Sequence, residues 1–161
     1  MYQKALELAP DDYQMWGNLG DARSQSAEGE GDAGEAYRKA LKLGESRLRI
    51  NPTDTDTKAD LAPYHAALGH PEQARRLSKE ALEQDPGNMY VHYNAALVHV
   101  RLGEPEPALA DLERAVELGY PRQLLSGDAG FKSLRPHPRF AALTARRPPA
   151  APTAPAEGGK K

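Results

Sequence analysis

The sequence contains no cysteine, which excludes disulfide frameworks, thiolate nucleophiles, iron–sulfur clusters and cysteine-bound zinc. Aromatic residues make up only 6% of the 161 residues, and valine, isoleucine and threonine are also scarce. These are the residues that favour strands, so a sheet-rich fold has little support. Alanine, leucine, glutamate, lysine and arginine dominate the first two thirds of the chain, and this composition predicts an all-α fold.

Long hydrophobic runs are also missing. Nowhere do eighteen consecutive apolar residues occur, and the first residues, MYQKALELAP, lack a basic start followed by an apolar stretch. A membrane span needs about 18 or more apolar residues, and a signal peptide needs such a start. We therefore expect neither a signal peptide nor a membrane span, and we expect a cytoplasmic protein.

Positive charge is scarce outside the C-terminal end. Residues 1–130 carry 14 Lys+Arg against 22 Asp+Glu, whereas residues 131–161 carry 7 against 1. Binding to nucleic acid phosphates needs a basic face, which the acidic body does not supply, so no nucleic acid partner is expected. The basic end has the composition of a solvated tail, and the Pro/Ala-rich residues 144–161 are expected to be disordered.

What the sequence does contain is a repeat with a period of 34 residues. Sliding the chain against itself by 34 residues aligns many identical pairs, of which seven are used here. An earlier copy appears when Pro10 and Asp12 are matched to Pro52 and Asp54, a spacing of 42 that equals the period plus eight inserted residues. The polar, glycine-rich stretch 24–31 is the expected insertion. The seven pairs are Pro52/Pro86, Ala62/Ala96, His65/His99, Leu68/Leu102, Gly69/Gly103, Ala74/Ala108 and Ala81/Ala115.

Capping residues divide each copy into two helices. Asp12, Asp54 and Asn88 can supply N-cap oxygens for the first helix, and a glycine in the left-handed conformation can end it. Pro71 and Pro105 then fit the opening of the second helix, where a missing N–H costs little. Small residues recur at matching places and should let the paired helices approach closely; they are Gly20, Ala40, Ala62, Ala74, Ala96 and Ala108.

This pattern resembles the tetratricopeptide repeat family over residues 2 to about 120. The resemblance implies a right-handed α-α superhelix of antiparallel helix pairs, in which the first helices line a concave groove and each repeat contacts only its neighbours. Pro63, inside a first helix, departs from the pattern and should kink it. The motif residues are Trp16, Leu19 and Gly20, then Leu61, Ala62, Gly69, Ala74, Ala81 and Pro86, and then Ala95, Ala96, Gly103, Ala108 and Ala115.

The expected organisation follows from these copies. Residues 1–11 resemble the second half of a repeat, which suggests a fragment or a late start and an open end that could self-associate. Repeats are expected over 12–53, with its insertion, then 54–87 and 88–120, followed by a C-terminal cap over 121–143 and the tail. The cap should pack through Leu124, Leu125, Phe131, Leu134, Phe140 and Leu143, and it resembles the end of tetratricopeptide regions in bacterial serine/threonine kinases or transcriptional regulators.

Catalytic motifs have little support. Gly29, Gly31 and Gly34 form a G-x-G-x-x-G, but no strand precedes it and acidic residues surround it, which favours a loop over a nucleotide site. The five histidines include no i, i+4 pair, and the recurrence of His65 and His99 indicates packing rather than metal ligation. No triad pattern occurs. We therefore predict no catalytic residue, cofactor or metal.

A protein or peptide partner is the remaining interpretation. If the first helices line a groove as in the family, Tyr90 and Tyr93 are the candidate anchors, because aromatic side chains give large contact area at low entropy cost. The alternative is that these tyrosines only cover the helix pair. The three aspartates expected in the groove predict a preference for neutral or basic peptides. The candidates are Gln14, Asn18, Asp21, Asp56, Asp60, Tyr90, Tyr93, Asn94 and Arg101.

Two functional hypotheses remain. The first is a non-catalytic interaction module, the sensor or scaffold arm of a larger signalling protein. The alternative is the non-catalytic C-terminal repeat portion of a bacterial serine/threonine protein kinase. An in-frame kinase domain upstream would distinguish them.

Overall fold

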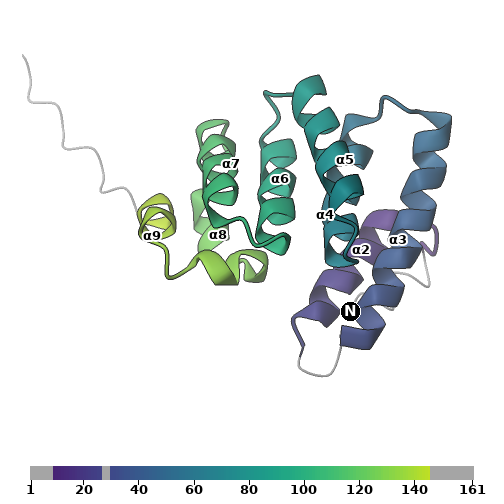
Figure 1. The fold of residues 1–161 in the computed structure, drawn as a ribbon, viewed down its shortest axis with the longest axis horizontal. Coiled ribbons are helices and arrows are strands. Elements are labelled where there is room, and N and C mark those ends of the chain that lie inside the picture. Colours follow the sequence, from purple (N-terminus) through teal and green to yellow (C-terminus); the bar gives the residue numbers. More distant parts are fainter. Residues whose placement is uncertain (1–8, 27–29, 146–161) are drawn as a thin grey trace, which may run out of the picture.

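The computed structural model describes residues 9–26 and 30–145, and within them every regular element is helical. The helix pairs follow one another along the long axis of the molecule (Figure 1). A short C-terminal group of helices closes the end beyond the last pair. The elements are α2 (Tyr13–Ser24), α3 (Glu30–Ile50), α4 (Thr55–Ala67), α5 (Pro71–Gln84), α6 (Met89–Arg101), α7 (Pro105–Glu117), α8 (Arg122–Gly127), the 3-10 helix η1 (Ala129–Leu134) and α9 (Pro138–Thr144).

Consecutive helices pack against each other in pairs. α2 packs on α3, α4 on α5 and α6 on α7, while α4 also contacts α3 and α6 from the neighbouring pairs. Isolated helices of 12–14 residues are marginal in water, so this stacking must supply their stability. The predicted α-α superhelix of helix pairs is confirmed.

The helix ends form where the sequence predicts them. The side chains of Asp12, Asp54 and Asn88 accept hydrogen bonds from backbone N–H groups in the first turns of α2, α4 and α6. Gly69 and Gly103, which follow α4 and α6, have φ values of 74° and 76°, a conformation that glycine adopts without steric cost. Pro71 and Pro105 open α5 and α7. These local predictions are confirmed.

Small residues lie where the paired helices touch. Ala40, Ala74 and Ala108 on the second helices are each 0% exposed. A Cβ atom added to Gly20 would lie 2.6 Å from the ring of Tyr37, a distance that real structures do not tolerate. The prediction that small residues here permit close helix approach is therefore confirmed.

Pro63 lies inside α4 without ending it, because the helix continues to Ala67. The proline is buried, and its carbonyl oxygen accepts a hydrogen bond from Nη1 of Arg101 at 2.7 Å. This hydrogen bond connects α4 to α6 of the next pair.

The C-terminal segment forms its own apolar contacts against the last pair. Leu125, Phe131, Leu134 and Phe140 are buried in one cluster with residues of α6 and α7. The prediction for Leu124 is wrong, because this side chain is 59% exposed. It occupies the outer face of the six-residue α8, whose inner face presents the neighbouring Leu125.

Some expectations lie outside the described residues. They concern residues 1–8 of the expected half repeat, residues 27–29 of the expected insertion, and the expected tail from residue 146 onward. The ends of the insertion are visible, since Ser24 closes α2 and Glu30 begins α3. Over the part of the chain that is described, no helix combines the length and apolar character that crossing a membrane requires.

Candidate functional site

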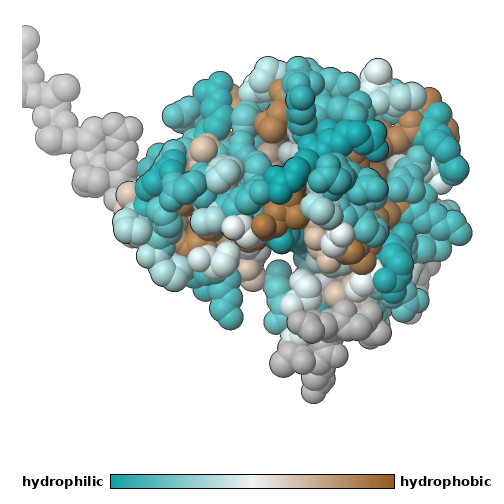
Figure 2. Space-filling model, in the orientation of Figure 1, coloured by the Kyte–Doolittle hydropathy of each residue, from teal (hydrophilic) through white to brown (hydrophobic). Residues whose placement is uncertain are grey.

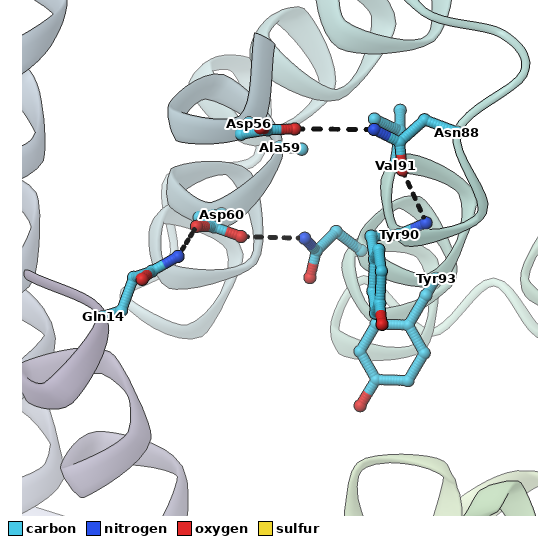
Figure 3. Close-up of a pocket in the computed structure, with 9 residues that line it drawn as sticks. Gln14, Asp56, Ala59, Asp60, Asn88, Tyr90, Val91 and Tyr93 are labelled. Carbon is cyan, nitrogen blue, oxygen red and sulfur yellow. Dashed lines mark hydrogen bonds between the residues drawn. The ribbon is translucent and has the colours of Figure 1, made fainter. Parts of the chain in front are cut away.

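The first helices of the three pairs present adjoining pockets, which we call the groove. One pocket of about 400 Å³ is lined by residues of α2, α4 and α6 together with Asn88 at the start of α6 (Figure 3). A second pocket of about 320 Å³ shares four of its lining residues, Gln14, Asp60, Tyr93 and Asn94. A third lies toward α3 and includes Arg101. All nine predicted groove residues line at least one of these pockets.

Sequence reasoning missed several lining residues. Asn88 was assigned only as a helix cap, yet its side chain also borders the first pocket. Pro63, Tyr64 and Leu97 border the second pocket, although their apolar or partly apolar character indicated burial. No periodic signal distinguishes such residues, because each of them also packs between helices.

Asp60 is the most heavily hydrogen-bonded groove residue. Its Oδ2 accepts from Nε2 of Gln14 at 2.7 Å and from Oη of Tyr13 at 3.0 Å, and its Oδ1 accepts from Nδ2 of Asn94 at 3.1 Å. Burial raises the pKa of the Asp60 carboxyl above its ordinary value, although these three donors oppose the rise. Asp60 therefore links α2, α4 and α6 across the groove.

Asp21 and Arg101 form a second connection between pairs. The Nη2 of Arg101 bonds Oδ1 of Asp21, which also accepts from Oη of Tyr37 at 2.6 Å. The guanidinium lies over the Tyr37 ring, 5.5 Å from its centroid. The two charges neutralise each other, so neither is a free charge for a ligand. The sequence placed both residues in the groove but carried no signal that they are paired.

The two predicted anchors, Tyr90 and Tyr93, differ in how much of the side chain is exposed to a partner. The Tyr93 hydroxyl donates to Oδ2 of Asp128 at 2.6 Å, and its ring stacks on Tyr120 at 4.9 Å between centroids. Burial is the largest cause that raises the pKa of Tyr93. Tyr90 instead is 57% exposed and contacts Tyr120 only through a ring edge. Tyr90 is thus the exposed aromatic of the groove, and Tyr93 is largely committed to the fold.

The first pocket presents acceptors rather than cations. Among the described residues its lining includes the carboxylates of Asp56 and Asp60 and no lysine or arginine. Asp56 is exposed, and its side-chain contact with Nδ2 of Asn88 is long at 3.5 Å. Figure 3 shows Asp56 and Asp60 on one side of the pocket and the Tyr90 and Tyr93 rings on the other.

One face of the molecule is mostly polar. On the face drawn in Figure 2, hydrophobic residues form small separate patches among hydrophilic ones. Over the residues that the structure describes, no group of three or more histidine, aspartate or glutamate side chains could hold a metal ion. Gly29 of the G-x-G-x-x-G stretch lies outside the described residues, whereas Gly31 and Gly34 lie in α3, so the loop expected there is wrong for these two glycines.

Comparison with known proteins identifies the fold. Residues 65–119 match the family described as tetratricopeptide repeat. The solved structure of TTC0263, described as a thermophilic TPR protein in Thermus thermophilus, matches 88% of this chain and 84% of its own, with a TM-score of 0.55 and 20% identity. This chain has the tetratricopeptide repeat fold.

Curated proteins are similar to parts of this chain, and two of them are described here. The FK506-binding protein-like protein of Mus musculus is 31% identical over 85 residues, which are 52% of this chain and 24% of that protein. Protein O-mannosyl-transferase TMTC3 of Homo sapiens is 26% identical over 143 residues, or 84% of this chain and 15% of that protein. The chain thus spans about a quarter or less of the length of these relatives.

Proposed function

We propose that the chain is a non-catalytic interaction module that binds a segment of a partner protein in the groove, and that this segment is neutral or basic. The observation that carries the proposal is the first pocket, in which an exposed tyrosine, Tyr90, faces two carboxylates, Asp56 and Asp60. Exposed aromatics at the centre of a concave surface are typical anchors of protein interfaces. Tetratricopeptide repeat proteins generally act as such scaffolds.

The hydrogen-bonding groups of the pocket support a partner that brings donors. The side-chain amide nitrogens of Gln14 and Asn94 both donate hydrogen bonds to Asp60. Neither side-chain amide oxygen accepts a hydrogen bond within the described part of the chain. These oxygens and the Asp56 carboxylate match backbone N–H groups or a lysine or arginine side chain. A cationic side chain beside Tyr90 would also gain a cation–π contact. An acidic segment would meet only like charges.

Direct binding measurements test this proposal. A set of fluorescent peptides of one length and apolar content, with lysine, glutamine or glutamate at the varied positions, is titrated with the full chain. We expect lysine peptides to bind most tightly and glutamate peptides most weakly. Tyr90→Ala should weaken the tightest peptide by about tenfold or more, since hot-spot truncation costs about 2 kcal/mol.

The matched control is Lys79→Ala. Lys79 lies on α5, the second helix of its pair, and its side chain is 76% exposed. This variant should bind as the original chain does, and circular dichroism should show that both variants remain folded. Tightest binding of glutamate peptides would contradict the charge preference, and unchanged binding by folded Tyr90→Ala would contradict the groove as the site.

The parent protein is a separate proposal. The kinase alternative depends on the resemblance of the C-terminal segment, residues 121–143, to the ends of such regions. A kinase domain encoded upstream in the same reading frame would support it, and another kind of domain there would refute it.

A further inference from the structure

His65 and His99 occupy equivalent positions 34 residues apart, yet an imidazole neighbours the first and a carboxylate the second. Each lies in the last turn of a first helix, α4 or α6. The same spacing relates His70 to Glu104, and each of these follows the glycine that ends the helix. The repeat thus places an imidazole beside His65 where it places a carboxylate beside His99.

The surroundings of His65 oppose its protonation. The ring is 8% exposed, and its Nδ1 lies 3.4 Å from Nδ1 of His70, so the two rings cannot both be charged while this hydrogen bond persists. Burial lowers the pKa of His65 to about 4, and His70 and Arg76 of α5 act in the same direction. The carboxylate that faces it, that of Glu45 on α3, is 3.7 Å from Nε2 and 57% exposed, so water screens it.

His99 lies between two carboxylates. Its Nδ1 lies 2.7 Å from Oε2 of Glu104, and its Nε2 lies 3.5 Å from Oδ2 of Asp111 on α7. A neutral imidazole has one N–H and can donate to only one of these carboxylates. The Nδ1 contact with Glu104 is a hydrogen bond, whereas the Nε2 contact with Asp111 is an ion-pair contact that requires a charged ring.

Neighbouring charged groups extend the network. Arg75 of α5 binds Glu104 through both terminal nitrogens, at 2.6 and 3.0 Å, and so connects the second pair to the third. On α6, His92 places Nδ1 3.3 Å from Oδ1 of Asp111 and Nε2 3.1 Å from the Pro86 carbonyl oxygen, so both its nitrogens also face acceptors. Lys79 and Glu83 of α5 border the same crevice as His99 and pair with each other at 3.7 Å.

We propose that these equivalent histidines give adjacent helix pairs opposite responses to protons. Protonation of His65 loosens the packing of α4 on α5, whereas protonation of His99 tightens α6 on α7 and, through Glu104 and Arg75, the junction with α5. Acidification therefore destabilises the second helix pair and stabilises the third. This device is independent of what the groove binds.

A pH titration of the full chain, followed by proton NMR spectroscopy, tests the proposal. Of the five histidines, His65 and His99 are followed through their ring C–H signals between pH 4 and pH 9. We expect the midpoint of His65 to lie at least about one pH unit below that of His99, the size of shift that a neighbouring charge produces. Midpoints that coincide would overturn the proposal.

Exchanging the neighbours tests the cause. His70→Glu, at an exposed position, should raise the His65 midpoint by about one unit and leave His99 unchanged. Glu104→Gln should lower the His99 midpoint and leave His65 unchanged. In urea denaturation at pH 5.5 and pH 7.5, the first variant should gain stability at the lower pH relative to the original chain, and the second should lose it. A pH dependence that neither folded variant alters would refute the proposal, whatever their absolute stabilities.

Discussion

Arg101 on α6 forms an ion pair with Asp21 on α2, eighty residues earlier in the chain, and in doing so joins the first and third helix pairs. The same guanidinium donates to the Pro63 carbonyl of the intervening α4. A repeat array is usually held together by contacts between adjacent pairs. Here one side chain contacts residues of all three pairs.

Loss of this connection should destabilise the whole array. Arg101→Met keeps the apolar stem but leaves the half-buried Asp21 carboxylate with Tyr37 as its one side-chain donor among the described residues. An unsatisfied polar group costs about 1–3 kcal/mol, so the free energy of unfolding in urea should fall by that amount. Asp21→Asn in the same background should recover part of the loss, because it removes the unpaired charge. Full additivity of the two substitutions would show that the residues do not interact.

Close helix approach in the first pair predicts a second effect. A Cβ atom on Gly20 would lie 2.6 Å from the Tyr37 ring, so Gly20→Ala should cost about 1–3 kcal/mol of unfolding free energy. Gly127→Ala is the control, because a Cβ atom there meets nothing within 4 Å. Thermal denaturation should place the first variant below the original chain and the second at or near it. Equal stability of both would contradict the predicted clash.

Local signals account for most of what the sequence predicted correctly. The caps at Asp54 and Asn88 and the turn at Gly69 depend on a few neighbouring residues, so pattern reasoning finds them. Leu124 was misassigned because a helix of six residues gives too short a period to separate its two faces.

The candidate site was predictable only in part. Residue positions in the groove follow from the repeat register, so all nine candidates line its pockets. What each side chain does there depends on partners distant in sequence, such as Asp128 for the Tyr93 hydroxyl. No periodic pattern encodes these pairs, and they decide that Tyr90 rather than Tyr93 is the exposed tyrosine.

The buried His65 predicts a loss of stability in acid. Its pKa is lowered to about 4 in the folded chain, so the unfolded chain binds the proton more readily. Its contribution is therefore complete above the ordinary histidine pKa of about 6.5 and is lost as the pH falls toward 4. His65→Gln should reduce the decrease in unfolding free energy between pH 7 and pH 4.5 by about 1–2 kcal/mol, after allowance for solvent screening. An unchanged pH dependence would contradict this assignment.

The C-terminal helices should be needed for the stability of the last pair. Phe131 is 0% exposed and contacts the Tyr93 ring edge-on, with 5.4 Å between centroids. Phe131→Ala should cost about 3–5 kcal/mol, because it removes a fully buried aromatic ring and leaves a cavity under the groove. Tyr93 should then lose its fixed orientation, so near-ultraviolet circular dichroism should weaken together with the unfolding free energy.

Leu124→Ala is the matched control for this segment, since that side chain is 59% exposed. Substitutions on the surface usually change stability by less than about 0.5 kcal/mol, and the aromatic dichroism should be retained. If Phe131→Ala were as stable as Leu124→Ala, the C-terminal helices would be an appendage that the repeats do not require. The larger loss instead would mean that the segment completes the core of the third pair and fixes the tyrosines that border the groove.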